Sequence, residues 1–261
     1  MTRIIHAELL RMARRRPLVL MAVFAALFAA VAAATVFTAA PATGSPVNRG
    51  TTLEALAGDG GGTEAFATAS SFAGFFVFVT FIALIATEFS GGTFRALLLR
   101  DPHRLRVIVG KLLGLLVIAA GVVALIEVLT FAASLVMAPT QDVSTANWFS
   151  LASLGDAGRD FATVFAGVAG WAVFGTTLAV IFRSVPLALA VGFAWAGPFE
   201  NIVVDSWDAG YRYFPGQVLA SLIRGGTPEL AFGRAVSTAT IYTAIAGAVG
   251  LVLVSRRDVT S

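Results

Sequence analysis

The sequence predicts an all-α, polytopic membrane protein with six transmembrane helices, and two observations carry this prediction. The 261 residues are 57% hydrophobic and only 13% charged, whereas about 25% of the residues in a soluble domain are charged. The charges lie in a few islands separated by apolar stretches of about twenty residues, each long enough to cross a ~30 Å hydrocarbon core. The alternating ten-residue segments of a membrane β-barrel do not occur in the sequence.

The first 16 residues form a basic, amphipathic segment that we expect to lie as an interfacial helix on the inner membrane surface. Five arginines accompany apolar residues such as Ile4 and Leu9, which is typical of helices that lie among lipid headgroups. The first span is predicted at 17–40. A signal peptide cleaved near Ala40-Pro41-Ala42 is the competing interpretation, but this apolar run exceeds the ~7–15 residues of a signal sequence.

The next five spans are predicted at 69–87, 112–137, 161–182, 185–204 and 235–254. Two polar connections, residues 41–68 and 139–160, are expected to be outer loops, and Gly60-Gly61-Gly62 is interpreted as a flexible linker. Residues 205–234 are expected to form an extracytoplasmic helical segment before the last span. Gly197-Pro198 is expected to end or kink the fifth helix, because proline interrupts the hydrogen bonds of a helix.

The distribution of basic residues predicts that both termini lie in the cytoplasm. With both ends of the chain, the 88–111 loop and Arg183 inside, 13 Lys and Arg residues lie inside and five outside, and this excess sets membrane orientation. We therefore expect a multi-pass protein of the cytoplasmic membrane, built as one transmembrane domain, 1–261. Because the same rule accounts for the basic pI near 9.9, the expected contact is membrane lipid and not nucleic acid.

The motifs of common enzymes are missing from the sequence. Gly110-Lys111 lacks the upstream glycine of a phosphate-binding loop and is followed by Leu112, so ATP hydrolysis by this chain is not expected. The chain has no cysteine and only two histidines, which disfavours a metal site. We therefore expect no catalytic residues, no metal and no cofactor bound by this chain.

The most informative stretch is 88–113, a basic segment between two apolar runs that holds five of the 18 Lys and Arg residues. Gly91-Gly92 is expected to break the preceding helix, and Asp101-Pro102 to begin the next one. Between them, we expect a short helix at 94–100 with Thr93 as its N-cap. An apolar ridge with a cation on such a helix suits insertion into a groove of a soluble partner.

The same segment resembles the permease subunits of the ABC-2 superfamily. The resemblance rests on Glu88-Phe89, on Gly92-Thr93 followed by Arg95 and by Leu97-Leu98, and on Pro102, Arg104 and Lys111-Leu112-Leu113. It implies a coupling helix in a cytoplasmic region, 88–111, that contacts a cytosolic ABC ATPase subunit present as a dimer. The residues that the resemblance assigns to this coupling are Glu88, Thr93, Phe94, Arg95, Leu97, Leu98 and Arg100.

The resemblance further implies that ATP and magnesium are bound by the partner subunit, and that a second permease subunit, identical or homologous, completes an exporter. The resemblance does not identify the substrate that such an exporter would transport. Two alternatives also stay open for the coupling segment: an ordinary charged loop at the lipid headgroups, or an internal ion pair between Glu88 and Arg95. A membrane anchor that recruits a cytosolic partner without transport is the alternative function.

Residues inside the spans suggest a transport pathway. Glu127 is expected to be the sole ionisable residue within a span, where an unpaired carboxylate costs about 2.5 kcal/mol or more. It is interpreted either as a substrate or proton contact or as a hydrogen-bonded link between helices. Aromatic residues of the second and fifth spans are interpreted either as pathway lining or as lipid-facing packing. The candidate pathway residues are Phe72, Phe76, Glu127, Phe193 and Trp195.

Overall fold

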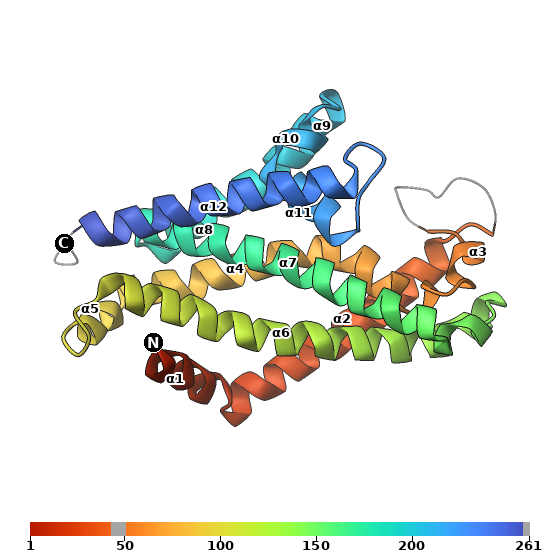
Figure 1. Ribbon diagram of the computed structural model, residues 1–261, viewed down its shortest axis with the longest axis horizontal. Helices are drawn as coiled ribbons and strands as arrows, with labels where there is room; N and C mark the ends of the chain where they lie inside the picture. The colour runs from red at the N-terminus through yellow and green to blue at the C-terminus, as the bar shows by residue number, and fades with distance from the viewer. Residues whose placement is uncertain (43–50, 258–261) are drawn as a thin grey trace. The chain divides into compact units, whose positions relative to one another are not determined.

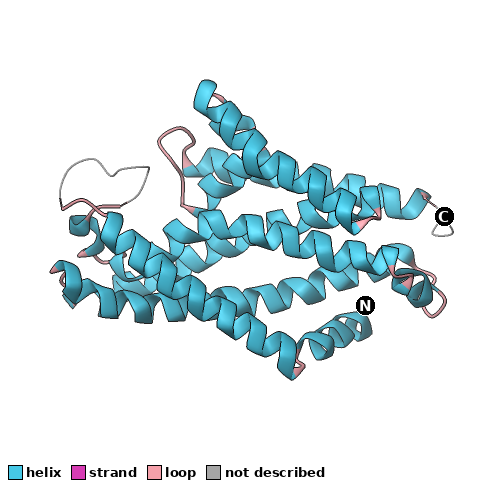
Figure 2. Cartoon of the chain, turned by 180° about the vertical axis from the view of Figure 1, so that it is seen from behind, coloured by secondary structure: helices cyan, strands magenta, loops and turns pink. Residues whose placement is uncertain are grey.

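The computed structural model describes residues 1–42 and 51–257, and within them the chain is helical with short connections (Figures 1 and 2). This described part contains no β-strand. The helices in chain order are α1 (Thr2–Met12), α2 (Arg15–Ala39), α3 (Leu53–Leu56), α4 (Gly61–Ser90), α5 (Thr93–Leu98), α6 (Arg104–Met137), η2 (Ala138–Gln141), η3 (Ala146–Phe149), α7 (Leu151–Phe182), α8 (Val185–Ala194), η4 (Trp195–Phe199), α9 (Glu200–Ser206), α10 (Gly210–Tyr213), α11 (Pro215–Ile223) and α12 (Phe232–Arg256).

The described residues include six helical stretches that are long and apolar enough to cross a membrane, which confirms the six predicted spans. The 30 residues of α4 extend about 45 Å at 1.5 Å per residue, well beyond a ~30 Å hydrocarbon core. The protein is therefore an all-α, polytopic membrane protein. The six stretches are Arg15–Ala39, Gly61–Ser90, Arg104–Gln141, Leu151–Phe182, Val185–Ser206 and Phe232–Arg256.

The two long polar connections are shorter than predicted, because helices α4 and α7 begin before the apolar runs do. Helix α4 starts at Gly61 and α7 starts at Leu151, since backbone hydrogen bonds continue a helix whether or not its side chains are apolar. The predicted linker at 60–62 is therefore wrong. A Cβ atom at Gly61 would lie 1.8 Å from the carbonyl oxygen of Leu56, so close backbone approach explains this glycine. Residues 43–50 of the first connection lie outside the described residues.

The basic N-terminal segment is helical, but it is divided between two helices. Helix α1 ends at Met12, and Arg14 occupies the N-cap position of α2. The predicted interfacial helix of residues 1–16 is therefore shorter at its C-terminal end.

The chain divides into two compact units. The first unit comprises Met1–Arg11, Phe72–Ile118 and Ala166–Ser261. In this unit the rings of Phe78 and Trp171 pack with their centroids 5.1 Å apart. Helices α7 and α12 are joined by a hydrogen bond of 3.0 Å from the hydroxyl of Thr177 to the carbonyl oxygen of Ala246.

The second unit comprises Met12–Ser71 and Ala119–Phe165. Its core gathers Phe37, Leu56 and Trp148 with two smaller residues. The indole N–H of Trp148 donates a 2.9 Å hydrogen bond to the carbonyl oxygen of Leu56. This bond ties α3 to η3 and satisfies the polar group of a large buried side chain.

The fifth span changes its helical geometry at the site where the sequence predicts an end or a kink, but the helix does not end there and continues to Ser206. Residues Trp195–Phe199 form a single π-helical turn, η4, that contains Pro198. Proline removes one helical hydrogen bond and is a frequent cause of a kink. The segment between the fifth and sixth spans contains two short helices, α10 and α11, before α12 begins at Phe232, so the helical character expected for 205–234 is confirmed.

Candidate functional site: a short helix anchored on a buried ion-pair network

The short helix predicted between the second and third spans is confirmed as α5, at Thr93–Leu98. It begins one residue earlier than predicted and ends two residues earlier. Its N-cap is Gly92, whose φ of 70° is left-handed, and not Thr93 as predicted. The hydroxyl of Thr93 instead donates a 3.2 Å hydrogen bond to the carbonyl oxygen of Glu88, which fastens α5 to the last turns of α4.

The side chains of α5 and of the two residues that follow it divide into a buried anchor and an exposed tip. Phe94 is only 1% exposed, and its ring lies 4.5 Å from that of Phe89, so the prediction that Phe94 faces a partner is wrong. Leu97 and Leu98 are half-buried. The outward surface is formed by Leu99, which is 85% exposed, together with the exposed arginines on either side, Arg95 and Arg100. We call these three residues the α5 tip.

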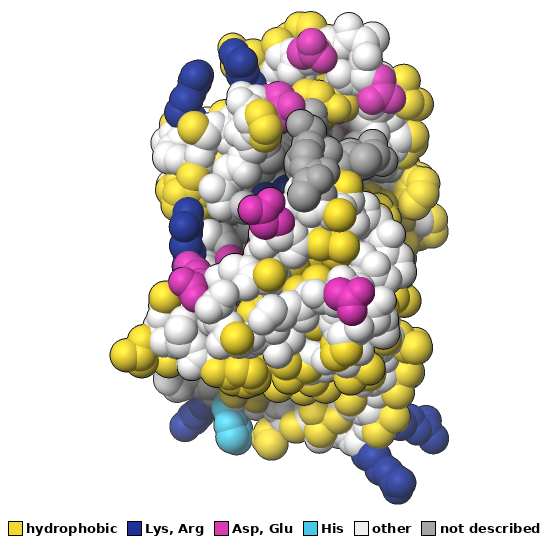
Figure 3. Space-filling model, turned by 90° about the vertical axis from the view of Figure 1, so that its right-hand side faces the viewer, with side chains coloured by type: hydrophobic (Ala, Val, Ile, Leu, Met, Phe, Trp, Pro, Cys, Tyr) yellow, Lys and Arg dark blue, Asp and Glu magenta, His cyan; other side chains and the backbone are white. Residues whose placement is uncertain are grey.

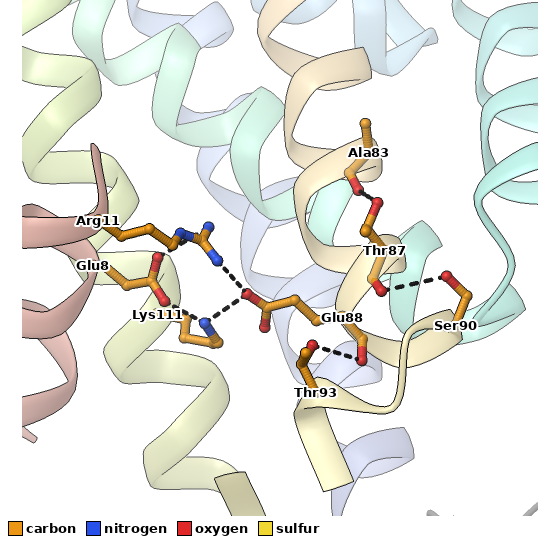
Figure 4. Close-up of polar contacts among 8 residues, drawn as sticks. All are labelled: Glu8, Arg11, Ala83, Thr87, Glu88, Ser90, Thr93 and Lys111. Carbon is orange, nitrogen blue, oxygen red and sulfur yellow. Dashed lines mark hydrogen bonds and ion pairs between the residues drawn. The ribbon is translucent and has the colours of Figure 1, made fainter. Parts of the chain in front are cut away.

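Glu88 lies at the base of α5 in a buried network of four charged side chains (Figure 4). Its Oε1 atom accepts a 2.9 Å hydrogen bond from Arg11 Nη1 and a 2.7 Å hydrogen bond from Lys111 Nζ. Lys111 Nζ also donates to Oε1 of Glu8, and Arg11 lies 3.1 Å from Glu8 Oε2. The alternative ion pair between Glu88 and Arg95 is wrong, since both ion-pair partners of Glu88 lie on other helices.

The charges of this network balance, and most of it is shielded from solvent. Lys111 is 3% exposed, and Glu8 and Glu88 are 5% and 6% exposed, while Arg11 reaches the surface. Buried charges are tolerated when they are paired and hydrogen-bonded, and here two carboxylates meet two cations. The network thus joins α1, α4 and α6 and holds the end of α4 from which α5 projects.

Glu88 is a predicted site residue, whereas the other three members of the network, Glu8, Arg11 and Lys111, were not predicted from the sequence. A signal for two of them was present. Glu8 is the only acidic residue among the first 16, and Lys111 is the only lysine of the chain and adjoins an apolar run. Isolated opposite charges in such surroundings need partners, but only the tertiary structure shows which charges meet.

The connection from α5 to α6 is held by Asp101. Its Oδ1 accepts a 3.1 Å hydrogen bond from the backbone N–H of His103 and lies 3.0 Å from His103 Nδ1. These hydrogen bonds, the backbone one first, lower the pKa of Asp101 below its usual value, so the carboxylate is ionised at neutral pH. Helix α6 begins at Arg104, and the start predicted at Asp101-Pro102 is therefore too early.

The predicted pathway residues are divided between the two compact units. Phe72, Phe76, Phe193 and Trp195 belong to the first unit and are all exposed on it. Glu127 belongs to the second unit and lines a cavity of about 450 Å³. None of the four aromatic residues lines this cavity.

The prediction that Glu127 is the sole ionisable residue in a span is wrong. Glu200 lies in the stretch Val185–Ser206 and Asp160 in Leu151–Phe182. Glu200 is 1% exposed and accepts hydrogen bonds of 2.7 Å from the indole of Trp195 and 3.3 Å from the backbone of Gly216. No group of three or more His, Asp or Glu residues with the geometry of a metal site occurs among the described residues.

Comparison with known proteins identifies the family without describing an activity. No curated protein matches the chain. A family model described as "Protein of unknown function (DUF2705)" matches residues 18–260, nearly the whole chain. This match includes five of the six spans completely, the α5 segment and two members of the ion-pair network, Glu88 and Lys111. The protein is thus a polytopic membrane protein that belongs to the DUF2705 family.

Proposed function

We propose that this protein is the membrane-spanning permease subunit of an ATP-binding cassette exporter. The observation that carries the proposal is helix α5: a short helix between the second and third spans, fastened at its base and exposed at its tip. A contact that transmits force from a soluble ATPase needs both properties. The resemblance of residues 88–113 to ABC-2 permeases points to the same role.

The chemistry of the α5 tip suits a protein partner. Arg95 and Arg100 flank the exposed Leu99, so a complementary groove would be apolar at its centre with acidic groups beside it. The ATPase subunits, as a dimer, would bind ATP and magnesium, in keeping with the missing phosphate-binding loop in this chain. A second permease subunit, identical or homologous, would complete the transporter.

The buried network supports force transmission in this proposal. A push on the α5 tip would reach Glu88 through the short connection at Gly92, and from there α1 and α6 through Arg11 and Lys111. Rigid elements tied in this way move together as one body. We place both termini and α5 in the cytoplasm, because of the excess of basic residues on that side.

The test is a pair of single substitutions on equally exposed leucines. Leu99→Glu places a negative charge in the expected acidic and apolar groove, so we expect loss of the co-purifying ATPase and of ATP hydrolysis in liposomes. The matched control is Leu151→Glu, at the first residue of α7, where Leu151 is 89% exposed. We expect this control to keep the ATPase, and both variants to insert in the membrane normally.

The same experiment distinguishes an exporter subunit from the alternative function, a membrane anchor. Full ATPase binding by Leu99→Glu would refute the assignment of α5 as the coupling element. An ATPase that binds through α5 but never moves a solute in liposomes would favour a membrane anchor that recruits a cytosolic partner.

A further inference from the structure

The second unit contains a cavity with the size and lining of a ligand site, and not those of a packing defect. Its volume is about 450 Å³, within the range of about 300–1,000 Å³ typical of small-molecule sites. The wall is mostly apolar and includes three aromatic residues, Phe131, Trp148 and Phe149. The ring of Phe131 lies 6.0 Å from that of Trp148 and 5.8 Å from that of Phe149, so the rings form a continuous aromatic wall.

Two carboxylates line the same cavity, Asp59 and Glu127, and no lysine or arginine does. Oε1 of Glu127 is fully buried and has no hydrogen-bond partner among the described residues. A buried polar atom without a partner is unfavourable, and within a span it marks a functional site by default. The unpaired oxygen therefore points to a ligand that supplies a positive charge or a donor.

The surroundings add more negative than positive charge. Asp160 accepts a 2.7 Å hydrogen bond from the hydroxyl of Thr63, a lining residue, and interacts electrostatically with Glu127. Asp160 also interacts electrostatically with two further acidic residues, Glu64 and Asp156, and with one cation, Arg159. On the face drawn in Figure 3, acidic side chains lie among hydrophobic ones, and lysine or arginine side chains lie mainly at its edges. A cavity lined by two carboxyl groups and aromatic rings, with no lysine or arginine in its wall, favours cations, because ring faces attract them.

We propose that this cavity binds a hydrophobic organic cation, an amine or onium compound with a bulky apolar body. The apolar body would pack against Phe131, Phe149 and the neighbouring leucines, and the cationic group would lie near Glu127. A bare metal ion is disfavoured by the mostly apolar wall and by the lack of a ligand cluster among the described residues. Binding of this cation does not depend on the proposed transport function, because it requires only this chain.

The experiment uses the purified full-length chain in lipid nanodiscs, with tetraphenylphosphonium as the probe and empty nanodiscs as the background. We expect saturable binding in equilibrium dialysis, and binding at least about tenfold weaker for triphenylphosphine oxide, a neutral analogue. Glu127→Gln keeps the shape of the side chain and removes its charge, so we expect it to weaken tetraphenylphosphonium binding by about tenfold, close to 1.4 kcal/mol.

Two further variants make the result independent of folding defects. Asp142→Asn is the matched control: Asp142 lies in the same unit, is exposed and does not line the cavity. Its backbone has φ of 54°, which asparagine tolerates, so we expect unchanged binding. Phe149→Leu changes an exposed residue and keeps its apolar character, and we expect about threefold weaker binding from the lost ring face.

Three results would each overturn the proposal. They are the absence of saturable binding, equal affinity for the cation and the neutral analogue, and wild-type affinity in a folded Glu127→Gln variant. If Glu127→Gln does not fold, wild-type affinity in Phe149→Leu would overturn the proposal in its place. Because no ATPase is present in this assay, its failure would leave the coupling role of α5 untouched, and the reverse also holds.

Discussion

At the scale of single residues, Lys111 is a cation that is only 3% exposed. Its ammonium group contacts two buried carboxylates, Glu8 and Glu88, on two other helices. A compact ammonium with three donors can serve two acceptors at once, whereas removing it would leave both carboxylates to Arg11 alone. The stability of this part of the molecule should therefore depend strongly on Lys111.

We expect Lys111→Met to lower the free energy of unfolding by about 3–5 kcal/mol, the usual cost of removing one partner from a buried ion pair. Thermal or denaturant unfolding of the purified protein in detergent measures this loss. Arg95→Met is the matched control: Arg95 is exposed and outside the network, so we expect a change of about 0.5 kcal/mol or less. Adding Glu8→Gln to Lys111→Met should recover part of the loss, because one unpaired charge disappears. Equal stability of Lys111→Met and the wild type would show that the network is not a structural anchor.

At the scale of elements, the interrupted fifth span and helix α11 depend on each other through Glu200. The π-helical turn η4 ends directly before Glu200, and that carboxylate accepts from both Trp195, at the start of η4, and Gly216, near the start of α11. The space is closely filled: a Cβ atom at Gly216 would lie 2.4 Å from Glu200 Oε2 and 3.2 Å from the ring of Trp171. A Cβ atom here would force the carboxyl group of Glu200 to shift, and Glu200 is buried with little space around it.

We expect Gly216→Ala to destabilise the protein by about 1–3 kcal/mol, as overpacking does in a well-packed interior. The matched control is Gly247→Ala in α12, where the nearest atom to a new Cβ is Val173 Cγ1 at an ordinary 3.6 Å. Because alanine is the better helix former, this control should stabilise the protein by up to about 1 kcal/mol. Unfolding midpoints of the two variants in the same detergent test the difference. A Gly216→Ala variant as stable as Gly247→Ala would rule out the close contact with Glu200.

At the scale of the whole molecule, the proposed orientation in the membrane can be tested with cysteine labelling. The chain has no cysteine, so an introduced thiol reports without background. Ser144, between η2 and η3, and Ser255, near the end of α12, are both exposed. Since the basic residues favour cytoplasmic termini, we expect an impermeant maleimide to label Ser144→Cys in intact cells and Ser255→Cys only after lysis. Labelling of Ser255→Cys in intact cells would refute this orientation.

The sequence by itself determined the fold class, the six spans, an irregularity of the fifth helix near Pro198 and the existence of α5. These features depend on local quantities: the length of an apolar run, the constraint that proline puts on the backbone, and glycine pairs that end helices. The bounds of α4 and α7 were missed at their N-terminal ends, because a helix does not stop where its side chains become polar. The orientation of the protein rests on charge alone and stays a prediction.

Only the tertiary structure decided which charges and rings meet. Glu88 pairs with Arg11 and Lys111, 77 and 23 residues away, and not with Arg95, which lies on the adjacent helix. Phe94 was expected to contact a partner, but it is buried and anchors α5. Glu127 lines a cavity together with Trp148 and Asp59. Such pairings are set by the packing of helices that are distant in sequence, and each segment alone is compatible with many partners. An unpaired charge is costly when it is buried, and it becomes buried only when the helices pack. The packing of the helices therefore decides which charges pair.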